Sequence, residues 1–308
     1  MKKIVVCGSY VTDLTGRAAR LPVPGQTVFG RSFRSGAGGK GSNQAVAAHR
    51  AGADVTMVAK LGDDVFAQFA RDFYTAEGMR TEGLLTAPGM ETGTALILVD
   101  EQSAQNEIMV ILGANGTISP EDLAKADPIL QQADYLLVQN EINADAVEAL
   151  LRRANARGCR TVWNPAPARA VDASLYRGVF CVTPNETEAS ELTGIPVTDP
   201  ATAARAAEWF LRQGVQNAVI TLGCQGVYAT DGTEGRMVPA LRVQAVDTTG
   251  AGDAFNGAFV TALAEGKDLF SAVHFGNAAA ALSVTKPGTA PAMPQRKEID
   301  ALLEKQYN

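Results

Sequence analysis

The chain has 308 residues, of which 46% are hydrophobic and 19% charged, enough to bury one large core without a second domain. The net charge of −6 and the lack of a basic run argue against nucleic acid and anionic membranes as partners. No stretch approaches a membrane span and the N-terminal apolar run is too short for a signal peptide, so we expect a cytoplasmic protein. The four cysteines form no C-x-x-C pair, so we expect buried free thiols, with a disulfide as the alternative.

The first predicted strand covers residues 4–7, a continuous apolar run that ends at Gly8 and is typical of a strand buried on both faces. Residues 8–13 lack the G-x-G-x-x-G pattern that a dinucleotide-binding fold places here, which argues against an NAD enzyme. Asp13 stands just past this strand, where a carboxylate either contacts a ligand or caps a turn.

Residues 14–37 are polar and interrupted by proline and glycine, so we expect no long helix there. Two further strands are predicted at 92–99 and 106–111, around a polar turn.

The run Gly-Gly-Lys-Gly-Ser-Asn at residues 38–43 opens a predicted helix over 44–51. It is no Walker A loop, because a glycine follows the lysine. Glycines that allow close approach, with Lys40 and Asn43 as hydrogen-bonding side chains, suit a polyhydroxylated ligand. The alternative is a glycine-rich turn with a surface lysine.

From residue 55 onward, strands alternate with helices. Strands are expected at 55–60, 135–139, 160–163, 179–183 and 218–222, and helices at 144–157, 186–193 and 201–213. The alternation predicts a parallel sheet flanked by helices, with the ligand at the carboxyl ends of the strands. Glu141, Asn185, Glu188 and Thr221 follow such ends, where each could also be a cap or turn residue.

Residues 241–246 alternate like a strand, and the run Asp-Thr-Thr-Gly-Ala-Gly-Asp at 247–253 leads into a predicted helix that runs to about Gly266. Glycines at a helix N-terminus form a site for an anion, because the first N–H groups lack partners and the helix dipole is positive there. Asp253 is then either a helix cap or a general base beside a phosphoryl group. Asp247 is a turn cap or a metal ligand.

Three of these motifs, in order, resemble signatures of the ribokinase family of carbohydrate kinases: residues 38–45, the Asn-x-x-Glu run at 185–188, and residues 247–253. The similarity extends nearly end to end. It implies a three-layer α/β fold with a mainly parallel central sheet, as a single domain over residues 1–308. It also implies a small β-sheet lid from about 13–37 and 92–112, and a homodimer through that lid, since exposed apolar lid positions would need a partner.

The resemblance implies ATP, Mg²⁺ and K⁺ as cofactors and assigns roles to residues of this chain. Asp253 would be the base, with an anion hole from the N–H groups of Gly250, Ala251 and Gly252. The sugar would be held by Asp13, Gly39, Lys40, Asn43 and Glu141. The nucleotide would be bound by Asn185, Thr221, Gly223, Gly226, Gly252 and Asn277, and Glu188 would organise Mg²⁺ through water. K⁺ would be bound, largely by main-chain oxygens, at Asp247, Thr249, Ser283, Lys286, Gly288 and Ala292, the last of which is commonly serine in the family.

The implied activity is transfer of a phosphoryl group from ATP to the primary 5-hydroxyl of D-ribose. Val11 stands where ribokinases commonly carry an asparagine. Deoxyribokinases also tend to carry an apolar residue at this position. A buried sugar hydroxyl without its partner costs about 1–3 kcal/mol, so 2-deoxyribose is the runner-up substrate. A nucleoside kinase is a further alternative, and a non-catalytic sugar sensor is a third, against which the presence of Asp253 argues.

Overall fold

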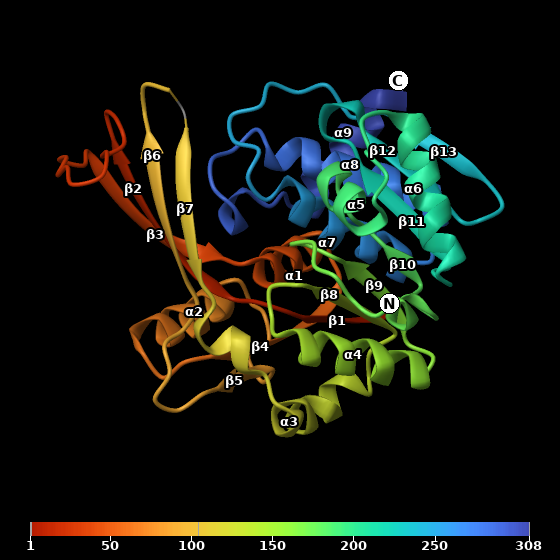
Figure 1. The fold of residues 1–308 in the computed structure, drawn as a ribbon, viewed down its shortest axis with the longest axis horizontal. Helices are drawn as coiled ribbons and strands as arrows, with labels where there is room; N and C mark the ends of the chain where they lie inside the picture. The colour runs from red at the N-terminus through yellow and green to blue at the C-terminus, as the bar shows by residue number, and fades with distance from the viewer. Residues whose placement is uncertain (1, 104, 308) are drawn as a thin grey trace.

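The computed structural model describes residues 2–103 and 105–307, and its centre is a nine-stranded sheet (Figure 1). The strand order is β13-β12-β11-β10-β9-β8-β1-β4-β5. The run from β11 to β5 is parallel, whereas β12 and β13 pair antiparallel at one edge. The strands are β1 (Lys3–Cys7), β4 (Asp54–Leu61), β5 (Leu84–Thr86), β8 (Tyr135–Gln139), β9 (Arg160–Asn164), β10 (Cys181–Val182), β11 (Asn217–Thr221), β12 (Val227–Thr230) and β13 (Gly235–Val238).

Helices cover both faces of this sheet and give the three layers. Because side chains alternate along a strand, Ile4 and Val6 of β1 pack with α1, α7 and α8, whereas Val5 and Cys7 pack with α3, α4 and α6. The helices are α1 (Lys40–Arg50), α2 (Val65–Ala76), α3 (Pro120–Leu130), α4 (Ala144–Ala156), α5 (Glu186–Thr193), α6 (Pro200–Arg212), α7 (Ala251–Ala264), α8 (Leu269–Ser283) and α9 (Arg296–Tyr307).

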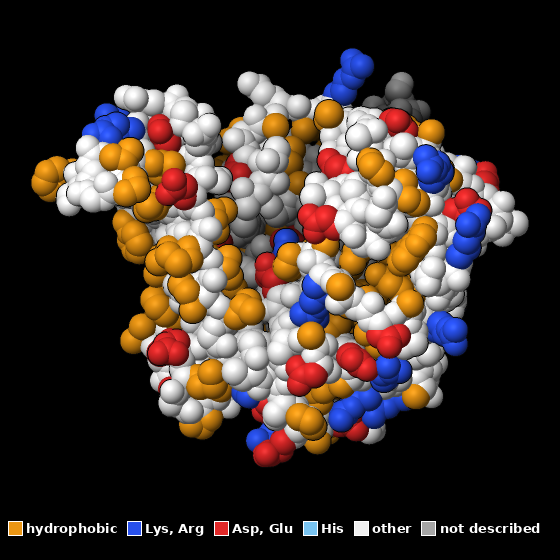
Figure 2. Space-filling view, viewed as in Figure 1, with side chains coloured by type: hydrophobic (Ala, Val, Ile, Leu, Met, Phe, Trp, Pro, Cys, Tyr) orange, Lys and Arg blue, Asp and Glu red, His pale blue; other side chains and the backbone are white. Residues whose placement is uncertain are grey.

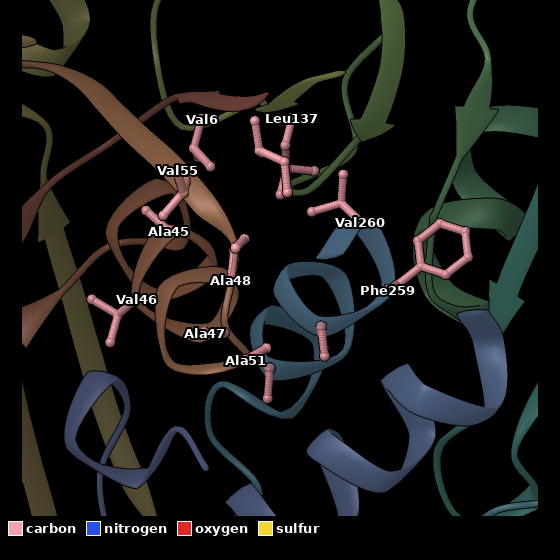
Figure 3. Close-up of a cluster of buried hydrophobic side chains, with 14 of the residues drawn as sticks. Val6, Ala45, Val46, Ala47, Ala48, Ala51, Val55, Leu137, Phe259 and Val260 are labelled. Carbon is pink, nitrogen blue, oxygen red and sulfur yellow. The ribbon is translucent and has the colours of Figure 1, made fainter. Parts of the chain in front are cut away.

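Small residues bring α1 and α7 close together over the sheet. Alanines of α1 face α7 in the buried cluster of Figure 3. At Gly257 of α7, a Cβ would lie only 2.5 Å from the Cβ of Ala47 and from the main-chain oxygen of Gln44. This close approach carries the polar start of α1 to the start of α7, where the site is built.

A second sheet of four strands projects from the body (Figure 1), in the order β3-β2-β6-β7. Its strands are β2 (Val11–Ala18), β3 (Ser32–Gly38), β6 (Thr94–Asp100) and β7 (Asn106–Ile111). The strands expected at 92–99 and 106–111 are thus confirmed. Large apolar side chains on it are exposed, with Phe33 at 68% and Met109 at 59%.

One expectation from the sequence was wrong, and that of buried free thiols holds only in part, since all four cysteines are free but two are not buried. Residues 241–246 form no strand: they are mostly exposed, and the amides of Val246 and Asp247 both donate to the carbonyl of Val284 instead of to a neighbouring strand. Cys7 and Cys181 are buried free thiols, but Cys159 is half-buried and Cys224 is exposed. Within the described residues, no helix has the length and apolar character needed to cross a membrane.

Candidate active site

The N-terminus of α7 leaves backbone donors open. Gly250 caps the helix with a left-handed φ of 78°, a conformation that favours glycine. The amide of Ala251 donates to the carbonyl of Thr248 at 3.3 Å. Among the described residues, the amides of Gly250 and Gly252 have no hydrogen-bond partner, and a Cβ at Gly252 would meet nothing within 4 Å. Two free N–H groups at a positive helix end suit an anion.

Asp253 lies in the first turn of α7, and only 7% of the residue is exposed. Its two carboxylate oxygens accept hydrogen bonds from α1: Oδ2 from Nδ2 of Asn43 and Oδ1 from Nε2 of Gln44, both at 2.9 Å. Burial raises the pKa of Asp253, while Lys40 and these two amide donors lower it, and the net direction is upward. A buried carboxylate beside open amides can accept a proton from an attacking hydroxyl.

The start of α1 also carries polar groups that face this carboxylate. The buried Oδ1 of Asn43 has no partner among the described residues. Burial lowers the pKa of Lys40, but the carboxylates of Asp253, Glu141 and Glu188 outweigh it and the net direction is upward, so the ammonium stays charged. Glu141, just after β8, accepts from the Lys40 amide at 2.8 Å and from the Ser9 hydroxyl at 2.6 Å.

Asp13 lies in β2 rather than just past a strand, and its side chain faces the same space. Burial, together with the charges of Glu141 and Asp253, raises its pKa to about 6, although a hydrogen bond from Thr289 acts in the opposite direction. The Thr289 hydroxyl lies 3.1 Å from Oδ2 of Asp13. A Cβ at Gly38 would collide with this carboxylate, and Gly39 has a φ of 85°, so the glycine pair is what lets backbone and carboxylate meet.

A cleft of about 730 Å³ leads to Asp13 between the projecting sheet and the body. Strands β2, β3, β6 and β7 line one side, and residues 246–249 and 287–291 line the other. Figure 2 shows a hollow here, with charged side chains at its base. Val11 is 2% exposed and begins β2, where it pairs with Gly38 two residues before Asp13.

The predicted nucleotide residues gather at the carboxyl ends of neighbouring strands. Asn185 caps α5 and forms a bridge with Thr221, which ends β11. Gly223 and Gly226 flank the short turn that follows. Asn277 of α8 donates to the carbonyl of Pro239 at 3.3 Å.

Glu188 completes the capping box of α5: its Oε2 accepts from the Asn185 amide at 2.9 Å. Burial raises its pKa. No cluster of three or more His, Cys, Asp or Glu side chains suited to a metal exists among the described residues. One carboxylate with a spare oxygen fits a Mg²⁺ held mainly by phosphates and water.

The loop after α8 brings the predicted cation ligands together. Asp247 accepts from the amides of Thr249 and Gly288, both at 3.0 Å. The Ser283 hydroxyl donates to the Ala280 carbonyl, which leaves its oxygen lone pairs available, whereas the Lys286 side chain pairs with Glu298 and offers no ligand atom. Four main-chain carbonyls accept no hydrogen bond from the described residues: those of Thr249, Lys286, Gly288 and Ala292. Unpartnered carbonyls beside an ionised carboxylate fit a monovalent cation, although Ala292 supplies no side-chain oxygen.

Gln44 was not predicted to be a site residue. Its place in the glycine-rich motif gave no sign that its amide reaches Asp253, 209 residues away. Thr289 and Ser9, which bind the carboxylates of Asp13 and Glu141, were missed for the same reason.

Residues 1–296 match the profile of the pfkB family of carbohydrate kinases. The chain belongs to this family. It is 39% identical to a ribokinase of Haemophilus influenzae, with 98% of this chain and 99% of the relative covered. It is 35% identical to a deoxyribokinase of Salmonella typhimurium, with coverages of 97% and 98%.

Solved structures agree with the fold. The kinase superposes on a ribokinase of Thermotoga maritima with a TM-score of 0.90 at 34% identity, covering 99% of this chain and all of that one. It superposes on an Arabidopsis thaliana ribokinase, solved with ribose and ATP, with a TM-score of 0.89 at 28% identity and 98% coverage of both chains. The three-layer fold with its separate small sheet is therefore confirmed. The protein is a sugar kinase that uses ATP as the phosphoryl donor.

Proposed function

We propose that this kinase transfers the γ-phosphoryl group of ATP to the 5-hydroxyl of D-ribose and releases ribose 5-phosphate and ADP. The observation that carries this is Asp253, a buried carboxylate held by the sugar-motif helix α1 beside two open amides of α7. Relatives named ribokinase over nearly the full chain support ribose as the sugar.

In the reaction, the sugar oxygen attacks phosphorus while its proton passes to Asp253. The bond from phosphorus to the ADP oxygen breaks, and the N–H groups of Gly250, Ala251 and Gly252 stabilise the charge on the moving phosphoryl oxygens. Asp13, Asn43 and Glu141 would accept hydroxyl hydrogens of the sugar, Lys40 would donate to it, and Gly39 would approach it through its backbone. This places the reacting hydroxyl between base and anion hole.

The nucleotide would lie along the ends of β10 and β11. Thr221, Gly223, Gly226 and Asn277 would contact the adenosine part, and Asn185 and Gly252 would lie at its phosphates. Mg²⁺, when bound, would neutralise phosphate charge, and Glu188 would hold it through water.

A monovalent cation site is proposed at Asp247 and the loop after α8. The open carbonyls of Thr249, Lys286, Gly288 and Ala292, together with the hydroxyl oxygen of Ser283, support it. A cation there would fix the loop next to the anion hole without touching the substrate.

The second candidate substrate is 2-deoxyribose, and Val11 is the observation that favours it. A buried valine gives a sugar hydroxyl no hydrogen bond, a loss of about 1–3 kcal/mol or roughly tenfold or more in preference. Comparing kcat/KM for ribose and 2-deoxyribose in wild type and Val11→Asn tests this. A wild type that strongly prefers ribose, unchanged in Val11→Asn, would show that this position does not distinguish the two sugars.

We further propose that residues 1–308 form one domain, that about 13–37 and 92–112 form the lid, and that the chain is a homodimer through it. The exposed Phe33, Ile108 and Met109 support a covered lid surface. Sedimentation of the wild type and of a Met109→Asp, Ile108→Lys double variant would test this, since charge on a real interface dissociates the dimer.

The test of function is ATP consumption across free pentoses, hexoses and nucleosides. We expect ribose to give the highest kcat/KM. A nucleoside as the best acceptor would identify a nucleoside kinase instead, and sugar binding without ADP release would identify a sensor. A cytoplasmic location stays a prediction.

A further inference from the structure

A chain of buried amide side chains runs along the carboxyl ends of β8 and β9 and ends on Asp253. Gln139 is the last residue of β8 and Asn164 is the last of β9, while Gln44 lies opposite them in α1. Nε2 of Gln139 donates to Oε1 of Gln44 at 2.6 Å. Nε2 of Gln44 then donates to Oδ1 of Asn164 at 3.0 Å and to Oδ1 of Asp253 at 2.9 Å. Gln44 and Gln139 are fully buried.

The contacts fix which way each amide points. The main-chain carbonyl of Thr183 can only accept, so the group that faces it at 2.7 Å is Nδ2 of Asn164. Oδ1 of Asn164 therefore faces Gln44, which must present its NH₂ group on that side. A carboxylate likewise accepts only. Both hydrogens of the Gln44 amide are thus committed, one to Asn164 and one to Asp253, and its oxygen is committed to Gln139.

The two donors on Asp253 differ in what else they do. Asn43 donates to Oδ2, while its own Oδ1 is open and is a proposed acceptor for a sugar hydroxyl. Gln44 holds Oδ1 from a network that continues into the sheet and contains no group assigned to substrate. Gln44 therefore holds the carboxylate without also serving as a ligand of the substrate.

We propose that Gln44 is a positioning residue for the phosphoryl-transfer reaction: its amide fixes the Asp253 carboxylate in the orientation from which it accepts the sugar proton. This rests on the proposed role of Asp253 as the base. A donor at this oxygen also stabilises the ionised carboxylate against the protonated acid. Other charges facing Asp253 are Lys40 on α1, Glu141 after β8, Glu188 on α5 and Asp13 on β2, and none of them is hydrogen-bonded to it among the described residues.

The test compares Gln44→Met with the matched control Gln139→Met. Each replaces one buried glutamine of the same chain, but only the first removes a donor from Asp253. For Gln44→Met we expect kcat to fall about 10- to 100-fold while the KM for the sugar changes little. In the plot of kcat against pH, the acid limb should move up by about one pH unit. For Gln139→Met we expect a comparable fall in melting temperature but an unshifted acid limb.

Where the methionine variants do not fold, Gln44→Glu and Gln139→Glu keep the side-chain shape. A second carboxyl in contact with Asp253 disfavours its ionisation, so the acid limb of Gln44→Glu should rise by more than about one pH unit. That of Gln139→Glu should rise less, because the new carboxyl, which burial and the facing Oε1 of Gln44 keep protonated, can still donate to that oxygen and leaves the donor on Asp253 in place. Equal shifts in the two Glu variants would overturn the proposal.

The outcome is separable from that of the proposed function. If Asp253→Asn turns over normally, the base assignment fails and the Gln44 proposal fails with it. If Asp253→Asn is inactive while Gln44→Met keeps the wild-type kcat and acid limb, only the Gln44 proposal fails.

Discussion

Sugar affinity should fall in mild acid because Asp13 changes its charge there. Burial, with Glu141 and Asp253 nearby, raises the pKa of Asp13 to about 6, well above that of an exposed aspartate. As a carboxylate, Asp13 offers acceptor sites to sugar hydroxyls. Once protonated, it loses the charge that makes these hydrogen bonds strong.

The size of the effect follows from the fraction of Asp13 that is ionised. With a pKa of about 6, Asp13 is almost fully ionised at pH 8 and about one-tenth ionised at pH 5. If only the ionised form binds well, the apparent Kd for ribose rises about tenfold between pH 8 and pH 5. The sign is fixed: proton uptake as pH falls through 6 weakens binding.

Isothermal titration of ribose should be done in Asp253→Asn, so that titration of the base does not contribute. This variant also removes the Asp253 charge that raises the pKa of Asp13, so the midpoint of the affinity change should lie somewhat below 6. Thr289→Val is the matched probe, because it removes the hydrogen bond that lowers the pKa of Asp13, so its midpoint should move to higher pH. An affinity that stays flat from pH 8 to pH 5, in a variant that remains folded, would refute this account.

Three further predictions use the rest of the site. Asp253→Asn should lower kcat by about 10²- to 10⁴-fold with sugar and ATP binding retained, and near-normal turnover would remove Asp253 as the base. Gly257→Ala should push α1 away from α7, which lowers the free energy of unfolding by about 1–3 kcal/mol and kcat by up to about 10²-fold. Gly116→Ala is the control and should change neither, because its Cβ would make an ordinary contact with Leu112 at 3.8 Å. Activity in K⁺ should exceed activity in tetramethylammonium at matched ionic strength, and equal rates would contradict the cation site.

The layered fold followed from the sequence because buried parallel strands have a clear signature. The run at 135–139 is apolar up to Gln139 and the run at 160–163 ends in Val162 and Trp163, and each strand is confirmed within one residue of its predicted end. The helix over 186–193 was predicted with its observed bounds, since Asn185 and Glu188 form the capping box that marks its start. Local chemistry sufficed at these positions.

The local sequence did not predict the structure of segments whose conformation depends on a distant hydrogen-bond partner. Residues 241–246 have the alternation of a strand, but the segment pairs with no strand, and the amide of Val246 donates to the carbonyl of Val284 instead. Hydrogen bonds between α1 and Asp253 join residues more than 200 positions apart. No periodicity records such a contact, so Gln44 looked like one more helical residue after a glycine-rich turn.

The start of α1 can approach Asp253 because two glycines leave room for close packing of the backbone. A Cβ at Gly41 would lie 2.6 Å from the amide nitrogen of Ser9, and a Cβ at Gly257 would lie 2.5 Å from the main-chain oxygen of Gln44. With a Cβ atom at Gly41 or Gly257, α1 could not lie as close to β1 and α7. Hydrogen bonds weaken steeply beyond about 3.2 Å, so a helix displaced by roughly 1 Å would lose both donors on Asp253. The glycines thus set the chemistry of the carboxylate without touching it, because they fix the distance over which Asn43 and Gln44 must reach.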